Sequence, residues 1–433
     1  MGRASARGDD GSSASHAGCA RVASLVLLVQ SCAAGCSSGS ASVSGPVQPR
    51  GSSIAARPAP PAPPRDPLVV GYDAALFRAR PKLLEKIRSS PHAYFRFIDV
   101  PFEDQVCRRF AMSVGDAVVN LHGDAHLEQY AVSASDRGLA DFDAATTGPA
   151  ALDLMRFMVS LRLAARQRGW SDGAPQLLAA FIAGYRAALK NPGAEPAEPS
   201  IVKKVRSRFD RTPEQWLDRM EGLMRPVDPA RAGVIKKASE EYFTAMREQN
   251  PDLQPWFFDV KHWGAMDVGI GSAFEEKYLS RVEGPTKAPG DDILLEAKQV
   301  SNLEGVSCIQ GPRGPDPFRI IIGQSRLGSG DQRLLGYFVA ADKAFYVQSW
   351  RVHYTELRIE DFASIDELTS VAEDAGQQLG RGHPKLIAAP RDAQLRRALA
   401  RALDREERNY HEAAADLEQK VVSAWMEFKH RSE

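Results

Sequence analysis

The strongest constraint on the fold comes from residues 122–129, a polar run with the sequence His-Gly-Asp-Ala-His-Leu-Glu-Gln that follows a short apolar stretch. Further along, the chain carries Asp141 and Asp143 on either side of a phenylalanine. In an extended segment these two aspartates lie on one face, because side chains alternate along a strand. Two carboxylates on one face favour a divalent cation such as Mg²⁺ or Mn²⁺. We therefore expect a site built from the polar run and the two aspartates.

Helical patterns dominate the first half of the chain. Apolar residues at helical spacing predict helices around 152–163 and 177–185. The pair Thr212-Pro213 has the form of a helix start, with proline in the first turn. A helix is also expected to begin at Asp153, after a turn at Gly148-Pro149.

The second half begins with strands and ends with helices. The predicted strands are 293–297, 318–322, 334–340 and 344–350, with a hairpin turn at Ala341-Asp342, and the predicted late helices are 365–383 and 391–430. The fold class is therefore α+β. Within a folded domain at 67–433 we expect a mainly helical part at 67–260, a small β lobe at 261–355 and C-terminal helices at 356–433.

Residues 1–36 have the pattern of an export signal, with a basic residue before an apolar run at 22–29 and small residues up to Cys36. This ending favours a lipoprotein-type signal in which Cys36 is lipidated, and Cys32 is a weaker candidate. An ordinary secretory signal, or a start site assigned too early, accounts for the same pattern. We expect an exported protein, tethered to a membrane only through the lipid. A spurious signal would instead leave it cytoplasmic.

Composition excludes several classes of protein. The 55 basic and 55 acidic residues give zero net charge, which argues against a nucleic-acid-binding arm or a polybasic membrane patch. Five cysteines are too few for a disulfide scaffold. The sequence leaves open whether Cys107 and Cys308 are paired or free. Residues 37–66, rich in Pro, Ser and Ala, predict a disordered linker. No partner protein and no oligomeric state can be inferred.

A second cluster lies far downstream of the first. Gly269, Gly271 and Ser272 form a Gly-x-Gly-Ser segment, and Lys298 follows near the end of a predicted strand. In kinases a Gly-rich hairpin covers the phosphates of ATP, and a lysine on a following strand pairs with them. Lys298 is either such a phosphate ligand or a surface lysine at a strand end.

The first cluster resembles the catalytic centre of aminoglycoside-phosphotransferase-like kinases. Their loop has the sequence His-Gly-Asp, four residues and Asn, and it precedes a strand with Ile-Asp and a helix that starts with Asp-Leu. The resemblance implies that Asp124 is the catalytic base that orients the acceptor hydroxyl and that Asp141 holds the Mg²⁺ of Mg·ATP. It implies that His122 and Asp153 support the loop. Gln129 stands at the position of the Asn, which is a second metal ligand.

The order of the two clusters resembles one bacterial family, Domain of Unknown Function 2252 (DUF2252), which is grouped with kinase-like folds. Its motifs are Ser-Pro-x-x-Phe-x-Arg, Gly-Asp-x-His-x-x-Asn, Asp-Phe-Asp-Glu, Gly-Pro and Asp, then Gly-x-Gly-Ser-x-Gly, Gln-x-Lys-Glu-Ala, Gly-Gln-Arg and Tyr-Val-Arg-Gln. The matching residues are Ser90, Pro91, Arg96, Gly123, Asp124, His126, Asp141, Phe142, Asp143, Gly148, Pro149, Asp153, Gly269, Gly271, Ser272, Lys298, Gly323, Gln324, Tyr346 and Val347. The resemblance implies a kinase-like two-lobed fold with permuted motif order, the helical lobe first and the small antiparallel β lobe later.

This chain departs from the family pattern at three polar positions. Gln129 replaces the loop Asn, Gln299 replaces the Glu after the lysine, and Gln348 replaces the Arg after Tyr-Val. The chain therefore resembles a divergent member, and the resemblance implies no particular acceptor.

Four further polar residues receive structural interpretations. His126 is expected to hold the loop by a hydrogen bond, with metal ligation as the alternative. Arg96 and Arg156 are expected to form ion pairs with the aspartates, with phosphate contacts as the alternative. His383 ends a predicted helix, where a charged imidazole suits the helix dipole, so we assign it no catalytic role.

Three functions are compatible with these motifs. The first is a phosphotransferase that uses Mg·ATP on an unknown small-molecule acceptor, although export would place it where ATP is scarce. The second is a catalytically inactive kinase-like binding or scaffold lipoprotein, which Gln129 and Gln299 favour. The third is a metal-dependent hydrolase built on the histidines and aspartates of the first cluster, which leaves Lys298 unexplained.

Overall fold

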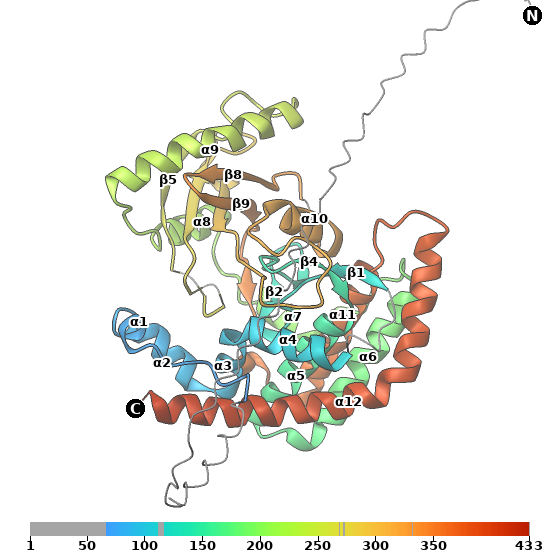
Figure 1. The fold of residues 1–433 in the computed structure, drawn as a ribbon. Coiled ribbons are helices and arrows are strands. Elements are labelled where there is room, and N and C mark those ends of the chain that lie inside the picture. Colours follow the sequence, from blue (N-terminus) through green and yellow to red (C-terminus); the bar gives the residue numbers. More distant parts are fainter. Residues whose placement is uncertain (1–65, 111–116, 268, 272, 331, 433) are drawn as a thin grey trace, which may run out of the picture. The chain divides into compact units, whose positions relative to one another are not determined.

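The computed structural model describes residues 66–110, 117–267, 269–271, 273–330 and 332–432. The predicted signal at 1–36, the predicted lipidation site Cys36, the predicted linker up to residue 65, and Ser272 lie outside these residues. Helices and strands together place the described part of the chain in the α+β class, as the sequence predicted (Figure 1).

Helices precede and follow the main group of strands (Figure 1). The early helices are α1 (Ala74–Arg78), α2 (Pro81–Ser89), α3 (Pro91–Phe97), α4 (Asp99–Phe110), α5 (Ala151–Arg168), α6 (Ala174–Lys190), α7 (Ser200–Arg206), α8 (Pro213–Glu221) and α9 (Pro229–Gln249). The later helices are α10 (Pro317–Leu327), α11 (Ile365–Gly382) and α12 (Arg391–Arg431). Short 3₁₀ turns are η1 (Leu127–Gln129), η2 (Ser171–Gly173), η3 (Pro289–Asp291) and η4 (Ile359–Asp361).

Three antiparallel sheets are present in the described residues. A two-stranded sheet pairs β1 (Val118–Leu121) with β4 (Thr146–Pro149), and a second sheet has the order β10 (Thr355–Glu356), β2 (Tyr130–Val132), β3 (Arg137–Leu139). The largest has the order β5 (Val260–Ala265), β6 (Lys277–Val282), β7 (Ile293–Gln299), β9 (Lys343–Trp350), β8 (Gly336–Ala340).

Most of the expected helices are confirmed. The helices α5, α6, α11 and α12 cover the segments with helical spacing. Thr212 caps α8 in a capping box with Gln215, which satisfies backbone N–H groups that the first turn leaves unpaired. The turn predicted at Gly148-Pro149 is wrong, because these residues pair with β1 as part of β4.

The strand predicted at 318–322 is also wrong. This segment lies in α10, where the Asp316 side chain accepts from the backbone N–H of Phe318 and Pro317 occupies the first turn. Burial follows helical spacing, with Ile320, Gln324 and Leu327 on the inner face. The Asp-Pro pair before this segment is a helix-start signal, which the apolar run after it obscured. The hairpin at Ala341-Asp342 is confirmed between β8 and β9.

Three hydrophobic clusters organise the packing of the described residues. The largest gathers α1 to α7, α10 to α12 and the two small sheets, and α5 is buried over most of its length within it. The second joins one face of the five-stranded sheet to α9 through Ile235, Tyr242 and Phe243, and the smallest joins α8 to β6 and β7 through Trp216 and Leu294. Helix α9 therefore shares a core with the sheet, although it precedes the predicted boundary at residue 260.

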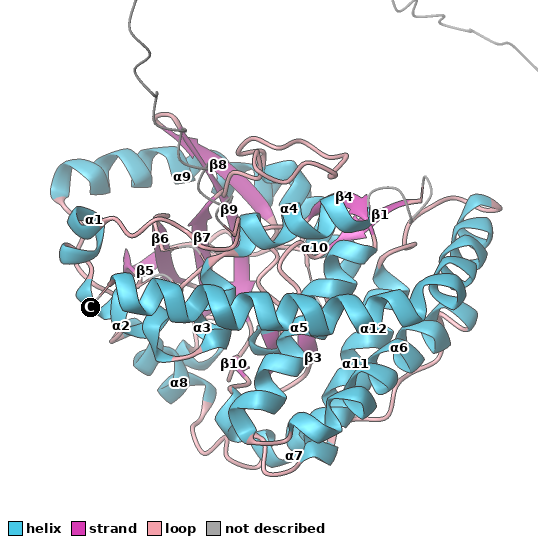
Figure 2. Cartoon of the chain, turned by 60° about the horizontal axis from the view of Figure 1, so that its bottom comes forward, coloured by secondary structure: helices cyan, strands magenta, loops and turns pink. Residues whose placement is uncertain are grey.

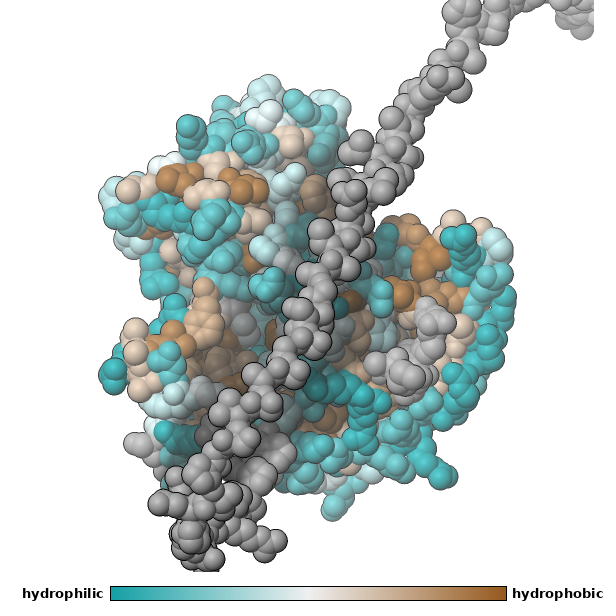
Figure 3. Space-filling model, viewed as in Figure 1, coloured by the Kyte–Doolittle hydropathy of each residue, from teal (hydrophilic) through white to brown (hydrophobic). Residues whose placement is uncertain are grey.

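The last helix, α12, packs against α2, α3, α5 and α6 (Figure 2). It buries one face, with Leu403, Tyr410 and Leu417 among the inward residues. Hydrophilic side chains cover the outer edge that α12 forms in Figure 3. Among the described helices, none has an apolar stretch long enough to cross a bilayer.

A disulfide joins Cys107 of α4 to Cys308, a pairing that the sequence left open. Cys308 lies in the segment that follows β7, and Ser307 beside it donates a 2.7 Å hydrogen bond to Asp104 of α4. These contacts fix the segment after β7 against α4.

Candidate functional site

The loop that carries Asp124 runs between β1 and η1, and a side chain from the first turn of α5 holds its backbone. The carboxylate of Asp153 accepts hydrogen bonds from the backbone N–H groups of His122 (2.7 Å) and Gly123 (2.9 Å). Gly123 has φ +87°, and a Cβ there would lie 2.0 Å from the carbonyl oxygen of Ala144. Only glycine fits this turn without moving the backbone.

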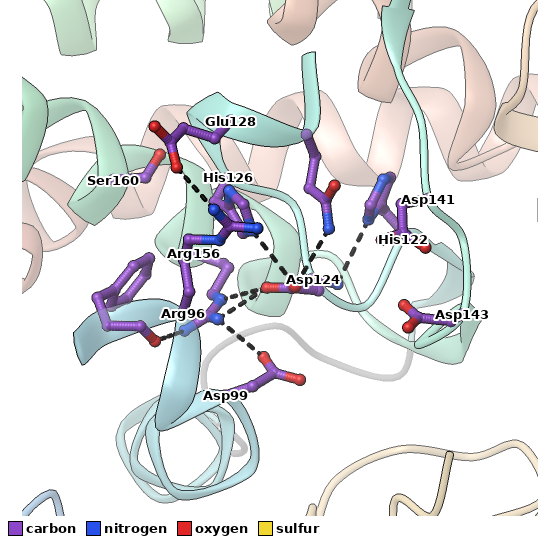
Figure 4. Close-up of polar contacts among 12 residues, drawn as sticks. Arg96, Asp99, His122, Asp124, His126, Glu128, Asp141, Asp143, Arg156 and Ser160 are labelled. Carbon is purple, nitrogen blue, oxygen red and sulfur yellow. Dashed lines mark hydrogen bonds and ion pairs between the residues drawn. The ribbon is translucent and has the colours of Figure 1, made fainter. Parts of the chain in front are cut away.

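Asp124 is buried and forms an ion pair with Arg156 through one of its carboxylate oxygens. Arg156 places Nε 2.9 Å from Oδ1 and Nη2 2.7 Å from Oδ1, and Gln129 donates to Oδ2 at 3.3 Å (Figure 4). His126 Nε2 lies 3.4 Å from Oδ2. Burial alone would raise the pKa of Asp124, but His126 and Arg156 hold it well below the ordinary aspartate range. The carboxylate therefore stays charged.

Arg156 is itself fully buried and contacts a second carboxylate. These contacts agree with our expectation that Arg156 forms ion pairs with aspartates. Its guanidinium stacks over the ring of Phe95 at 3.9 Å and reaches Asp99 at 3.2 Å (Figure 4). Burial, with the nearby carboxylates, raises the pKa of Asp99 and of Glu103 well above their ordinary values. Sequence reasoning missed both acids, because nothing distinguishes them from other polar residues of α4.

Arg96 does not pair with the aspartates, contrary to our expectation. Its Nη1 donates to Glu128 at 2.7 Å, on the far side of the loop from Asp143 (Figure 4). The reason is the 3₁₀ turn η1, which directs Glu128 toward α3. His122 contacts the carbonyl oxygen of Ala140 through Nε2 at 2.9 Å, so its ring spans the loop to the segment before Asp141.

Asp143 lies in a turn and Asp141 comes just before it, so the two do not form the extended segment that we expected. Asp141 has φ +60°, a left-handed conformation that aspartate tolerates better than most residues. Both carboxylates nevertheless reach one cation, the ammonium of Lys298. Its Nζ lies 3.0 Å from Asp141 Oδ1 and 2.5 Å from Asp143 Oδ2.

Lys298 is 2% exposed, so the alternative of a surface lysine is wrong. Burial would lower its pKa, but the two aspartates hold it well above the ordinary lysine value. Lys298 in turn keeps the pKa of Asp141 low against the effect of burial. Burial and the adjacent Asp141 raise the pKa of Asp143. The cluster thus carries two carboxylates for one ammonium.

Two cavities meet at Asp141. The first, of about 130 Å³, lies between the five-stranded sheet and β2–β3, beside residues 351–354 that connect β9 to β10, and we call it the connector cavity. The second, of about 300 Å³, lies between α4 and the glycine segment, and we call it the acidic cavity. Asp141 is the one described residue that lines both.

The acidic cavity is lined by carboxylates from four parts of the chain. They are Asp99, Asp124, Asp141, Asp143 and Glu275. Gly269 and Gly271 line its wall beside them, so the structure brings the late glycine segment to the early polar run. Burial and the neighbouring Asp143 raise the pKa of Glu275 to about 8. Sequence reasoning missed Glu275, because the adjacent Glu276 gives the same local signal.

Carboxylate and amide oxygens from this group suit a hard cation. Gln129, a predicted metal ligand, instead meets Asp124 through its amide nitrogen. Within the described ranges, no three side chains of His, Cys, Asp or Glu are arranged as a metal site.

Comparison with known families matches the chain over residues 75–225 and 201–431 to a family described as an uncharacterised protein conserved in bacteria, DUF2252. The chain belongs to the DUF2252 family. It matches no curated protein and no solved structure. The family match spans the polar run, the glycine segment and Lys298, so all three parts of the site lie within DUF2252 sequence.

Proposed function

We propose that this DUF2252 protein is a phosphotransferase that moves the γ-phosphoryl group of Mg·ATP to a hydroxyl of a small-molecule acceptor. One observation carries the proposal. Lys298, from a strand late in the chain, is buried against Asp141 and Asp143, which belong to the early polar cluster. A phosphate-binding lysine and a metal-binding aspartate must face each other across a nucleotide site.

The order of elements around Lys298 supports a kinase-like small lobe. In kinases a Gly-rich loop covers the phosphates, the lysine lies on the third strand, and a helix follows. Here the glycine segment joins β5 to β6, β7 is the third strand, and α10 follows before β8 and β9. This resemblance extends the α+β class to a proposed two-lobed, permuted kinase-like fold.

The two cavities suggest how the substrates divide. We assign the nucleoside to the connector cavity, where Trp350 and Tyr354 offer aromatic surface and Gln348 offers a polar group. We assign the acceptor to the acidic cavity, where Asp124 lies. The γ-phosphoryl group would then pass beside Asp141, which lines both.

Each residue then has a defined task in the transfer. Asp124 orients the acceptor hydroxyl and takes its proton as the oxygen forms a bond to the γ-phosphorus, and the proton then passes to solvent. The bond from that phosphorus to the β–γ bridging oxygen breaks, and ADP leaves. Lys298 pairs with the phosphates, and Gly269 and Gly271 cover them. Asp141, Asp143 and Gln129 carry oxygens suited to Mg²⁺, which neutralises phosphate charge when bound.

A second candidate is an exported kinase-like binding module without transfer, and two observations favour it. The Cys107–Cys308 disulfide is typical of an oxidising compartment, where ATP is scarce. Arg156 holds Oδ1 of Asp124 in an ion pair, which competes with an acceptor hydroxyl. Under this candidate, export and lipidation at Cys36 would be part of the function.

Calorimetric titration of Mg·ATP into the full-length chain tests the proposal. We expect micromolar binding that D141N loses and D124N keeps, because Asp141 contacts the phosphate site and Asp124 contacts the acceptor. D172N, at an exposed aspartate of η2, is the matched control and should bind as the unchanged protein does. Phosphoryl transfer to water, measured as ADP release, should be lost in D124N.

The outcomes separate the candidates. Binding without ADP release in the unchanged protein supports the binding module. Absence of Mg·ATP binding by a folded protein would overturn the phosphotransferase.

A further inference from the structure

His383, at the end of α11, contacts the loop that carries Asp124 through a buried carboxylate. The imidazole is fully buried, with Nε2 3.0 Å from Oδ2 of Asp153 and Nδ1 2.8 Å from the hydroxyl of Tyr185. Because a carboxylate only accepts hydrogen bonds, Nε2 carries the proton. Nδ1 is then free to accept from Tyr185 in this tautomer. From its place at a helix end we expected His383 to have no catalytic role.

The same carboxylate holds the backbone of the loop. Oδ2 of Asp153 accepts from both His383 and the N–H of His122, while Oδ1 accepts from Gly123. Rotation of this carboxylate would break bonds to two consecutive loop amides. His383 therefore fixes the orientation on which the loop depends.

The backbone of His383 makes a second connection to the loop. Its carbonyl oxygen accepts from the backbone N–H of Asn120 at 3.1 Å and from the side-chain amide of Asn120 at 3.0 Å. Asn120 lies in β1, two residues before His122. The end of α11 thus contacts Asn120, which precedes the loop, and Asp153, which binds the loop amides.

The position of His383 is itself fixed by close helix packing. A Cβ on Gly376 of α11 would lie 2.1 Å from the carbonyl oxygen of Phe181 in α6, so these helices touch backbone to backbone. Tyr185, one turn after Phe181, then meets His383. A continuous contact runs from α6 through His383 and Asp153 to the loop.

We propose that His383 is a positioning residue for phosphoryl transfer, which holds Asp153 and through it the Asp124 loop. This inference rests on the proposed function, because its kinetic consequence is loss of transfer. His383 lines neither the connector cavity nor the acidic cavity, so its loss should spare nucleotide binding.

Two substitutions separate positioning from general packing. H383Q keeps a nitrogen donor at the place of Nε2, whereas H383N is one bond shorter and does not reach Asp153. With Mg·ATP and water as acceptor in the full chain, we expect kcat for ADP release to fall about tenfold or more in H383N. H383Q should restore it to within about threefold, and the Kd of Mg·ATP should change less than about twofold in both.

Y185F is the third variant, and it removes only the hydroxyl that meets Nδ1. We expect kcat to fall less than in H383N, with an unchanged Kd. Equal kcat in H383N, H383Q and the unchanged protein would overturn the inference. Loss of nucleotide affinity in parallel with kcat, without rescue by H383Q, would also overturn it.

A measurement without catalysis keeps this inference distinct from the proposed function. The ¹⁵N shifts of His383 in the unchanged full chain should show a protonated Nε2, and a protonated Nδ1 with bare Nε2 would overturn the inference even if H383N fails to fold. Amide hydrogen exchange at His122 and Gly123 should be faster in H383N and restored in H383Q. A chain that shows these signals but binds no Mg·ATP disproves the phosphotransferase and leaves the loop-holding role of His383 standing.

Discussion

Lys298 Nζ lies 3.0 Å from Asp141 Oδ1, although 157 residues separate them in the sequence. The contact joins the five-stranded sheet to the polar cluster between β3 and β4. Asp143 shares the same ammonium. This three-residue cluster fixes how the late glycine segment and the early loop face each other, at the point where Asp141 lines both cavities.

Removal of this lysine should be costly. Lys298→Met removes a buried cation from two half-buried carboxylates, so we expect the free energy of unfolding to fall by up to about 3 kcal/mol. Lys343→Met, on the neighbouring strand, removes a more exposed pair with Glu276 and should cost less than about 1 kcal/mol. Urea denaturation of both variants measures the difference.

The control for this interpretation is a double-mutant cycle. Asp141→Asn added to Lys298→Met should cost less than the sum of the two single changes, because it removes one unpaired charge. Additive losses would contradict a direct interaction between Lys298 and Asp141.

Glu275 predicts an unusual dependence of stability on pH. Its folded pKa of about 8 lies above the ordinary glutamate value of 4.5, so the folded state binds a proton that the unfolded state lacks between these values. The contribution of Glu275 to stability therefore falls as pH rises from 4.5 to 8. Glu275→Gln should remove this decline, which thermal denaturation from pH 5 to 8 would detect.

The adjacent Glu276 provides a matched control of opposite sign. Burial opposes ionisation, but Lys343, Tyr278 and Arg231 lower the pKa of Glu276 to about 2. Its contribution is present above pH 4.5 and is lost as pH falls toward 2. Glu276→Gln should thus lower stability equally from pH 5 to 8. A parallel response of the two variants over this range would refute the difference between these neighbours.

Local patterns predicted much of this fold. Apolar spacing gave α5 and α6 correctly, and the Thr-Pro start of α8 was visible because capping is a local property. The strand prediction for 318–322 was wrong because the local pattern there does not distinguish a strand from a helix. Five apolar or long residues in a row fit a strand and a buried helix equally, and only the preceding Asp-Pro favours the helix.

The candidate site shows the same limit. Motif order indicated that Lys298 and Asp141 belong to one site, since each residue type has a defined task there. The partner of Arg96 and the buried Asp99 depend on how α3 and α4 pack, which no local spacing encodes. The position of His383 at a helix end was expected, but its contact with Asp153, 230 residues away, was not.

Arg156 should be intolerant of change in a specific way. Arg156→Met leaves the buried Asp124 and the half-buried Asp99 without their cation, and we expect a loss of about 3–5 kcal/mol in unfolding free energy. Arg156→Lys keeps the charge but not the planar guanidinium that contacts Asp124 and Asp99 together, so it should recover only part of the loss. Chemical denaturation ranks the unfolding free energies of the unchanged protein and the two variants. Full recovery of stability in Arg156→Lys would show that the geometry of the guanidinium contacts is unimportant.

A double variant that combines Asp124→Asn with Arg156→Met tests whether these two residues interact directly. It removes one of the uncompensated charges, so the double variant should be more stable than Arg156→Met alone. A double variant that is less stable would mean that Asp124 is held chiefly by Gln129 and His126.

The disulfide gives the last prediction. Cys107 and Cys308 are separated by 201 residues, so their bond restricts a long loop of the unfolded chain. It also fixes the segment after β7, which with α4 lines the acidic cavity through Ser301 and Asp99. We expect reduction to lower the free energy of unfolding by about 2–5 kcal/mol. The Tm should therefore fall when a reductant is added, as differential scanning calorimetry would measure.

The variant C107S/C308S is the control, because it lacks the bond under all conditions. Its Tm should match that of the reduced protein and should not respond to reductant, since the other three cysteines lie before residue 37. A further fall of its Tm with reductant would place the sensitivity outside this bond. An unchanged Tm of the native chain on full reduction would show that Ser307, Asp104 and the surrounding packing hold the segment without the disulfide.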